Sequence, residues 1–227
     1  KTETQWGVSN RIAKSLGKIG GDLARDGLLK AVNNGEAKIR VGIIQALGGF
    51  LGDEKVARVL KKISGGDPSY KVEAEALASL GRIKAKECRP FLESFLGRRS
   101  HNDTGRSAIF RALASLEDEE GWSTLLEGAD YGAPRGSRFS AVQGLAKLAG
   151  RFEHLKPEAI NALKRFARET RGTPSATFRG KLAAIHAMGA LEELSAVPTL
   201  RKLAEGETDG RLIRRAEETI ARLFESA

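Results

Sequence analysis

The chain has one cysteine, one methionine, two tryptophans and two tyrosines among its 227 residues. A lone cysteine excludes an intrachain disulfide, and Cys88 is expected to be a small buried apolar residue. Aromatic residues make up only 6% of the composition, so aliphatic side chains must fill the core. No apolar run approaches the roughly 20 residues of a membrane span, and the first residues do not resemble a signal peptide. We therefore expect no membrane partner.

Catalytic sequence patterns are also missing. The three histidines, His101, His154 and His186, form no HExxH motif and no other compact ligand spacing. The sequence has no glycine-rich phosphate loop, no nucleophile elbow and no pair of carboxylates with a supporting base. We expect no catalytic residue, no cofactor and no metal site in this chain, and His186 is expected to be solvated.

What the sequence does contain is a repeated phrase. Seven helix-like stretches end on phrases such as ALGGFL, SLGRIK and AMGALE, and one residue of each serves as the reference position of its copy. The reference positions are Gly17, Gly48, Gly81, Ala114, Ala146, Gly189 and Ala221. They are 31 to 33 residues apart, except for one step of 43. Such a period without strand signals is typical of a helical solenoid. We predict an all-α solenoid (superhelix) of about seven helical hairpins, the first incomplete, in a single domain over residues 1–227.

The third copy shows how one repeat is built. Residues 54–63 carry apolar side chains at helical spacing, and Gly65, Gly66 and Pro68 then end that helix. Residues 71–83 carry a second apolar stripe. Two helices joined by a tight turn predict an antiparallel hairpin.

Aligning the copies on their reference positions assigns faces to the second helix of each hairpin. The position of Leu80 is apolar throughout and is predicted to lie in the core. The position of Ala78 is predicted to face water, because the other copies have Lys14, Gln45, Arg111, Gln143, His186 and Glu218 there. The position of Arg82, four residues later, shares that surface. Second helices commonly line the concave side of a solenoid. The candidate binding residues are therefore Lys14, Lys18, Arg82, Arg111, Lys147, His186 and Arg222.

The two ends of the array have different patterns. The position of Leu77 is apolar in six copies but is Glu217 in the last, as expected of a capping repeat. The array is therefore expected to end there. The stretch from about Trp6 to Lys18 lacks a first helix before it, so we expect the array to continue upstream. The 43-residue step predicts an enlarged unit, with a longer first helix or loop around residues 151–178.

Basic residues outnumber acidic residues 38 to 29, and the net charge is +9. One position at the start of the second helices is basic in four copies: Lys38, Lys71, Arg179 and Arg211. Nearby turn acids, such as Asp67, favour a ladder of ion pairs between adjacent hairpins. A phosphate-binding stripe is the alternative, but Thr104 and Gly136 interrupt it, and no aromatic platform accompanies it. A second basic cluster, expected as a solvated helix face, comprises Lys164, Arg165, Arg168 and Arg171.

With period and hairpins established, the array resembles HEAT repeats, in which a turn aspartate typically pairs with a base on the second helix. Asp67 and Lys71 look like that pairing. A narrower resemblance covers most of the chain, through QWGV (5–8), GDPSYKVEAEALASLGRIK (66–84), RSHNDTGRSAIFRALASLED (99–118) and DGRLIRRAEETIARL (209–223). This succession resembles the C-terminal HEAT region of bacterial M1-type zinc aminopeptidases. In that region a tryptophan-containing repeat start, a DPSY turn and an S-(W/H)-N-D helix start recur in this order.

The resemblance implies a non-catalytic accessory domain. The zinc ligands and general base of the M1 family lie in an HExxH…E segment, and the substrate amine is recognised by a GxMEN segment; this chain has neither. Zinc is then expected only in an upstream catalytic domain, which would be the main partner, with a peptide or protein ligand as a further partner. The alternative is a nucleic-acid-binding HEAT array that uses its basic surface. A HEAT-type hydroxylase would need His-Glu pairs, which are absent. A cytoplasmic location is favoured by default, and an address signal upstream of Lys1 would change that.

Overall fold

The computed structural model describes residues 2–85, 87–130, 132–168 and 174–226. The regular secondary structure in these ranges is helical, with no strand, as an all-α fold requires. Contacts divide the chain into two compact units, Lys1–Leu116 and Glu117–Ala227, which are described separately. The expected single domain over residues 1–227 stays a prediction.

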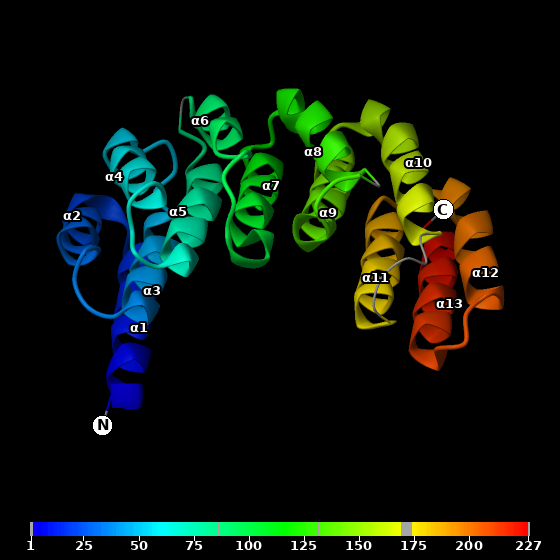
Figure 1. The fold of residues 1–227 in the computed structure, drawn as a ribbon, viewed down its shortest axis with the longest axis horizontal. Helices are drawn as coiled ribbons and strands as arrows, with labels where there is room; N and C mark the ends of the chain where they lie inside the picture. Colours follow the sequence, from blue (N-terminus) through cyan, green and yellow to red (C-terminus); the bar gives the residue numbers. More distant parts are fainter. Residues whose placement is uncertain (1, 86, 131, 169–173, 227) are drawn as a thin grey trace. The chain divides into compact units, whose positions relative to one another are not determined.

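The first unit is a row of second helices with a row of first helices packed on it. Helices α1, α3, α5 and α7 pack side by side in chain order, and α2, α4 and α6 cover α3, α5 and α7 (Figure 1). The elements are α1 (Thr2–Ile19), α2 (Gly21–Ala31), α3 (Ala37–Leu47), α4 (Glu54–Ser64), α5 (Tyr70–Ile83), α6 (Cys88–Ser94), the 3₁₀ turn η1 (His101–Asp103) and α7 (Thr104–Leu116). The unit thus holds three hairpins and the unpaired helix α1.

The second unit repeats this arrangement. Helices α9, α11 and α13 pack side by side, and α8, α10 and α12 are their first helices (Figure 1). The elements are η2 (Glu119–Gly121), α8 (Trp122–Ala129), α9 (Arg135–Arg151), η3 (Glu153–Leu155), α10 (Lys156–Ala167), α11 (Pro174–Ala190), η4 (Leu194–Ala196), α12 (Val197–Glu205) and α13 (Gly210–Glu225). With the first unit, the described residues form six hairpins and one half-hairpin, so the predicted solenoid architecture is confirmed.

Local sequence chemistry sets the hairpin boundaries. Asp53 caps α4, because its carboxylate accepts a hydrogen bond from the Val56 amide at 3.0 Å. Helix α4 ends at Ser64 with Gly65 as its C-cap, and in the following turn the Asp67 carboxylate accepts from the Ser69 amide at 2.8 Å. Helix α5 then starts at Tyr70. The hairpin predicted from the third copy is therefore confirmed.

The core follows the predicted apolar positions. At the position of Leu80, five side chains are fully buried: Leu47, Leu80, Leu113, Leu145 and Met188. Leu16 and Ile220, in α1 and α13, are half-buried at the same position. Cys88 is a free buried cysteine, as expected, and burial raises the pKa of its thiol.

Glycine at the reference position allows second helices to approach closely. A Cβ on Gly17 would lie 3.1 Å from the Cβ of Ala46 in the next second helix, α3. A Cβ on Gly81 would overlap the backbone of Ala112 in α7. The reference position of one helix therefore faces the residue two before the reference position of the next helix.

Two sequence predictions need correction. Ala78, predicted to face water, is only 4% exposed, because its single methyl group does not extend beyond α3 and α7, which flank α5. The 43-residue step does not lengthen the first helix, since α10 has 12 residues and α4 has 11. Instead, the second helix α11 has 17 residues against 14 in α5. The alternative of a longer loop falls partly on residues 169–173, which lie outside the described residues.

Candidate binding surfaces on the second helices

An ion-pair ladder joins adjacent hairpins, but it uses a different position from the one predicted. Arg40 of α3 donates two hydrogen bonds of 2.9 Å to Asp67 in the turn before α5, from Nε to Oδ2 and from Nη2 to Oδ1. Both side chains are largely buried, at 14% and 10% exposure. Such a two-bonded pair in a partly desolvated site is directional and resists screening. It fixes α3 against the turn that precedes α5.

The same pairing recurs in the second unit. Lys181 of α11 donates to Glu207, in the turn before α13, at 2.5 Å, and this bond lowers the pKa of the Glu207 carboxyl. Arg40 and Lys181 both lie eight residues before their reference positions, Gly48 and Gly189. The acids lie 14 residues before the next reference positions, so the ladder has a constant register.

The predicted ladder position, two residues earlier, is therefore wrong for this role. Asp67 binds Arg40 of the preceding hairpin, and Lys71 is exposed. Lys38 lies over the Trp6 ring, with its ammonium 5.1 Å from the ring centroid. Arg211 binds Asp209 within its own turn at 2.7 Å. The physical reason is helix geometry: a shift of two residues turns a side chain by more than half a turn.

Two of the candidate binding residues are held in place by neighbouring groups. Arg82 donates from Nη2 to Glu75 at 2.7 Å and to Ser79 at 2.6 Å, and a Cβ on Gly48 would lie 2.7 Å from its Nε. Arg222 lies over Gly189 in the same way, where an added Cβ would overlap its guanidinium. The missing side chain of a glycine at the reference position thus also leaves room for the arginine of the next helix. These two side chains serve packing between repeats.

The remaining candidates are Arg111 in the first unit and Lys147 and His186 in the second. Arg111, on α7, is exposed and makes a long 3.4 Å contact to the Ser107 carbonyl of its own helix. Lys147 on α9 and His186 on α11 are exposed in the second unit. Partial burial, with a smaller effect from the charges of Arg215 and Arg222, lowers the pKa of His186. His186 therefore adds no positive charge at neutral pH.

Lys14 and Lys18 do come together, in a groove between α1 and α3. The groove has a volume of about 470 Å³, within the range of small-ligand sites. Its lining residues are Asn10, Arg11, Lys14, Gly17, Lys18, Gly42, Gln45, Ala46 and Gly49. We call this the α1–α3 groove. The space at Gly42 is filled by the Asn10 side chain, and the three cations lie on α1.

The α1–α3 groove differs electrostatically from the ladder. Within the described chain, Arg11, Lys14 and Lys18 form no ion pair, whereas Arg40 and Lys181 are paired. Asn10 Oδ1 is buried at the groove without a hydrogen-bond partner, and a buried unpaired acceptor is costly. Sequence reasoning found Lys14 and Lys18 but missed Arg11 and Asn10. Their spacing of three and four residues from Lys14 was the available signal.

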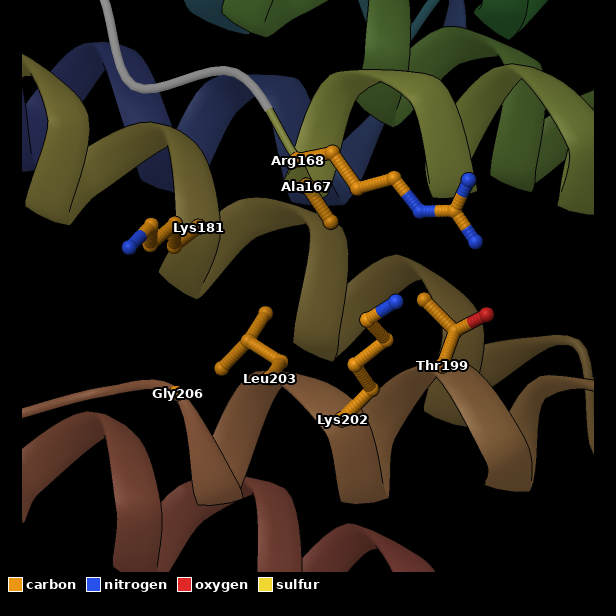
Figure 2. Close-up of a pocket in the computed structure, with 7 residues that line it drawn as sticks. All are labelled: Ala167, Arg168, Lys181, Thr199, Lys202, Leu203 and Gly206. Carbon is orange, nitrogen blue, oxygen red and sulfur yellow. The ribbon is translucent and has the colours of Figure 1, made fainter.

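A smaller basic pocket lies in the second unit, between α10, α11 and α12. Its volume is about 180 Å³, and it is lined by Ala167, Arg168, Lys181, Thr199, Lys202, Leu203 and Gly206. In Figure 2, Lys202 rises from α12 into the space below Arg168, while Lys181 points away from it. Lys181 is already paired with Glu207. The expected basic cluster of Lys164, Arg165, Arg168 and Arg171 begins at the end of α10. Its last member, Arg171, lies outside the described residues.

Two further observations concern metals and membranes. Among the described residues, no group of three or more His, Cys, Asp and Glu side chains is arranged to hold a metal ion. None of the helices in those ranges has the length and apolar content of a membrane span.

Comparison with known proteins supports the repeat assignment. Residues 64–146 match the family of HEAT repeats. No curated protein matches the chain by sequence. Among solved structures, the chain is similar to one in the complex of CpcE and CpcF of phycocyanin lyase from Nostoc sp. PCC7120. The TM-score is 0.57 and the identity 17%, over 96% of this chain and 88% of that one. It also matches human deoxyhypusine hydroxylase, with a TM-score of 0.43 and 19% identity, over 98% of this chain and 81% of that one. Residues 64–146 thus match HEAT repeats, and the chain as a whole has a helical-repeat fold.

Proposed function

We propose that this chain is a non-catalytic interaction domain whose α1–α3 groove binds an acidic segment of a peptide or protein. The observation that carries the proposal is the difference between the ladder and the groove. Ladder bases are neutralised by turn acids of the next hairpin, whereas Arg11, Lys14 and Lys18 have no described acidic partner. Cations gathered along a groove attract carboxylates.

Nucleic acid is the alternative ligand, and the groove favours it less. No aromatic side chain is among the residues that line the groove. Single-stranded nucleic acid is usually held by bases stacked on aromatic rings, in addition to phosphate contacts. A groove lined by three cations and the amides of Asn10 and Gln45 suits carboxylates and peptide groups better.

The finer proposal concerns the parent protein. We infer that the chain is the C-terminal accessory region of an M1-type zinc aminopeptidase, where it packs on the catalytic domain and shapes access to it. The support is the order of the QWGV, DPSY and SHND phrases, together with the HEAT-repeat match over 64–146. Zinc would be held upstream, and this chain would supply only binding and packing surfaces.

The groove is tested by charge reversal. Lys14→Glu combined with Lys18→Glu should weaken binding of a fluorescent oligo-glutamate peptide by about tenfold or more, because two attractive charges become repulsive. The control reverses Arg58 and Lys62, two exposed bases on α4. Equal loss in both variants would indicate a diffuse charge effect and would contradict the proposal. Tighter binding of an oligonucleotide than of the peptide, with a steep salt dependence, would favour nucleic acid instead.

The aminopeptidase proposal is tested separately. The coding sequence upstream of Lys1 should contain an HExxH segment and a GxMEN segment within a few hundred residues. The 227-residue chain should not hydrolyse aminoacyl substrates, with or without added zinc. Zinc-dependent hydrolysis by this chain would refute the proposal, as would an upstream frame without the HExxH segment.

A further inference from the structure

The second helices meet through a repeated interface. The glycine or alanine at the reference position of one helix meets the residue two before the reference position of the next. Examples are Gly17 with Ala46 and Gly81 with Ala112, and a Cβ on Gly189 would lie 2.7 Å from Thr219. Ser79 adds a hydrogen bond, from its hydroxyl to the Ile44 carbonyl at 3.1 Å. Within each unit, a second helix therefore has one face for its predecessor and another for its successor.

The predecessor face is buried in all copies except the first. At two residues before the reference position, the buried residues are Ala46, Ser79, Ala112, Gly144, Ala187 and Thr219. At five residues before it, on the same face, they are Ile43, Ala76, Ile109, Ala141, Ala184 and Ala216, none more than 5% exposed. In α1 these two positions hold Ser15, which is exposed, and Ile12, which is 56% exposed.

The exposed face of α1 is an apolar stripe. Val8 and Ile19 extend it by one turn at each end and are 56% and 76% exposed. Residues 8, 12, 15 and 19 follow the spacing that places side chains on one side of a helix. Leu23, at the start of α2, is 93% exposed. An aligned apolar stripe of this kind marks a contact surface rather than scattered exposed residues.

We propose that this stripe, which we call the α1 end face, receives a further helical hairpin of the same repeat type, supplied by the polypeptide on the N-terminal side of α1. The argument is continuity with the established interface: the same face of α5 receives α3, and that of α13 receives α11. The occupant is a second helix parallel to α1, with glycine or alanine opposite Ser15. Four positions before that glycine or alanine, the occupant has an apolar residue, like Ile44 in α3 and Leu77 in α5.

The inference can be tested with a three-helix segment taken from the chain itself. Residues 20–69, which include α2, α3 and α4, are duplicated and joined directly to Trp6. Trp6 lies 11 residues before Gly17, as Tyr70 lies 11 before Gly81, so the register of the natural connection is kept. Amide hydrogen exchange of residues 8–19 should slow by at least about tenfold relative to the unmodified chain, since the added helix covers them.

The matched control carries Ile44→Asp in the duplicated segment only, because Ile44 lies on the face that would meet α1. This control should restore fast exchange, and equal protection in both fusions would overturn the proposal. Sedimentation of the unmodified chain gives the competing outcome. A dimer that Ile12→Asp dissociates would show that a second copy occupies the end face, which would also overturn it. These readouts do not depend on aminopeptidase activity or on the α1–α3 groove. The proposed functions and the proposal for the α1 end face can therefore fail independently of one another.

Discussion

Helices α1 and α13 each have one side that no other second helix of their unit covers, and the chemistry of those sides is opposite. On α13 the successor side holds Glu217, where every earlier copy has a buried apolar residue. On α1 the predecessor side holds Val8, Ile12 and Ile19, all more than half exposed. The end face of a solenoid can therefore be of two kinds. A polar end face is compatible with water, whereas an apolar end face is stable when another repeat packs on it.

The comparison also shows that sequence position alone does not determine burial. Ile12, Ile43 and Ile109 occupy one position of the repeat and are 56%, 5% and 1% exposed. Their own side chains are identical, so the difference comes from the helix that packs on them. An alignment of repeats identifies the face, and a neighbouring helix is needed to bury it.

The largest expected effect comes from replacing these isoleucines with alanine, because the cost in stability should differ between the buried and the exposed positions. Ile109→Ala should lower the free energy of unfolding by about 2–5 kcal/mol, because it removes buried methyl groups and leaves a cavity. Ile12→Ala should change it by less than about 0.5 kcal/mol. Urea denaturation followed by circular dichroism measures both, with Ile43→Ala as a second buried control. A cost at Ile12 similar to that at Ile109 would mean that the α1 end face is already covered in solution.

Acid should weaken the last hairpin selectively. The pKa of the Asp209 carboxyl is lowered to about 2 by its bonds to Arg211, and that of Glu207 is lowered by Lys181. A carboxyl whose pKa is lower in the folded state contributes stability above its unfolded pKa and loses it as pH falls through the folded pKa. The protection factors of the α13 amides, which correct for the intrinsic pH dependence of exchange, should therefore fall between about pH 4.5 and about pH 2.

Lys181→Met provides the control for this titration. The variant should be less stable than the parent at neutral pH, and the difference should shrink in acid, where Glu207 is protonated in both proteins. A difference that stayed constant over the whole range would show that the Lys181–Glu207 bond is not the source of the pH dependence.

The smallest expected effect on stability is a change of the C-terminal end face. Glu217→Ile gives α13 the apolar residue of the earlier copies, at an exposed site, so the free energy of unfolding should change by less than about 0.5 kcal/mol. Self-association should increase instead, because the end face then resembles an unpaired packing surface. Sedimentation velocity measures it, and Glu218→Ile, also exposed on α13, is the control. Equal association of the two variants would count against a special role of the Glu217 side.

The hairpins and the core could be predicted because their signals are local. Leu80 and its counterparts recur at a fixed register, and Gly65, Gly66 and Pro68 end a helix whatever lies nearby. The assignment of Ala78 to the surface failed, because the chemistry of its counterparts says nothing about how closely α7 approaches at Gly81.

The binding surface could be predicted only in part. Lys14 and Lys18 were identified and lie in one groove, yet Arg82 and Arg222 share their helix face and are seated on glycines of the preceding helix. The ion-pair ladder was expected, but it was assigned to Lys38 and Lys71 instead of Arg40. Charge and periodicity do not tell which of several bases on a helix reaches an acid on the next hairpin, since side-chain direction decides it.

The sequence by itself determined the repeat period, the two-helix unit, the buried register and the polar side of the last helix, because each depends on residues close together along the chain. Only the tertiary structure decided which bases are neutralised, where the α1–α3 groove opens and which apolar stripe is left uncovered. These depend on distances between residues about thirty positions apart, and such distances are set by the packing of one hairpin on the next.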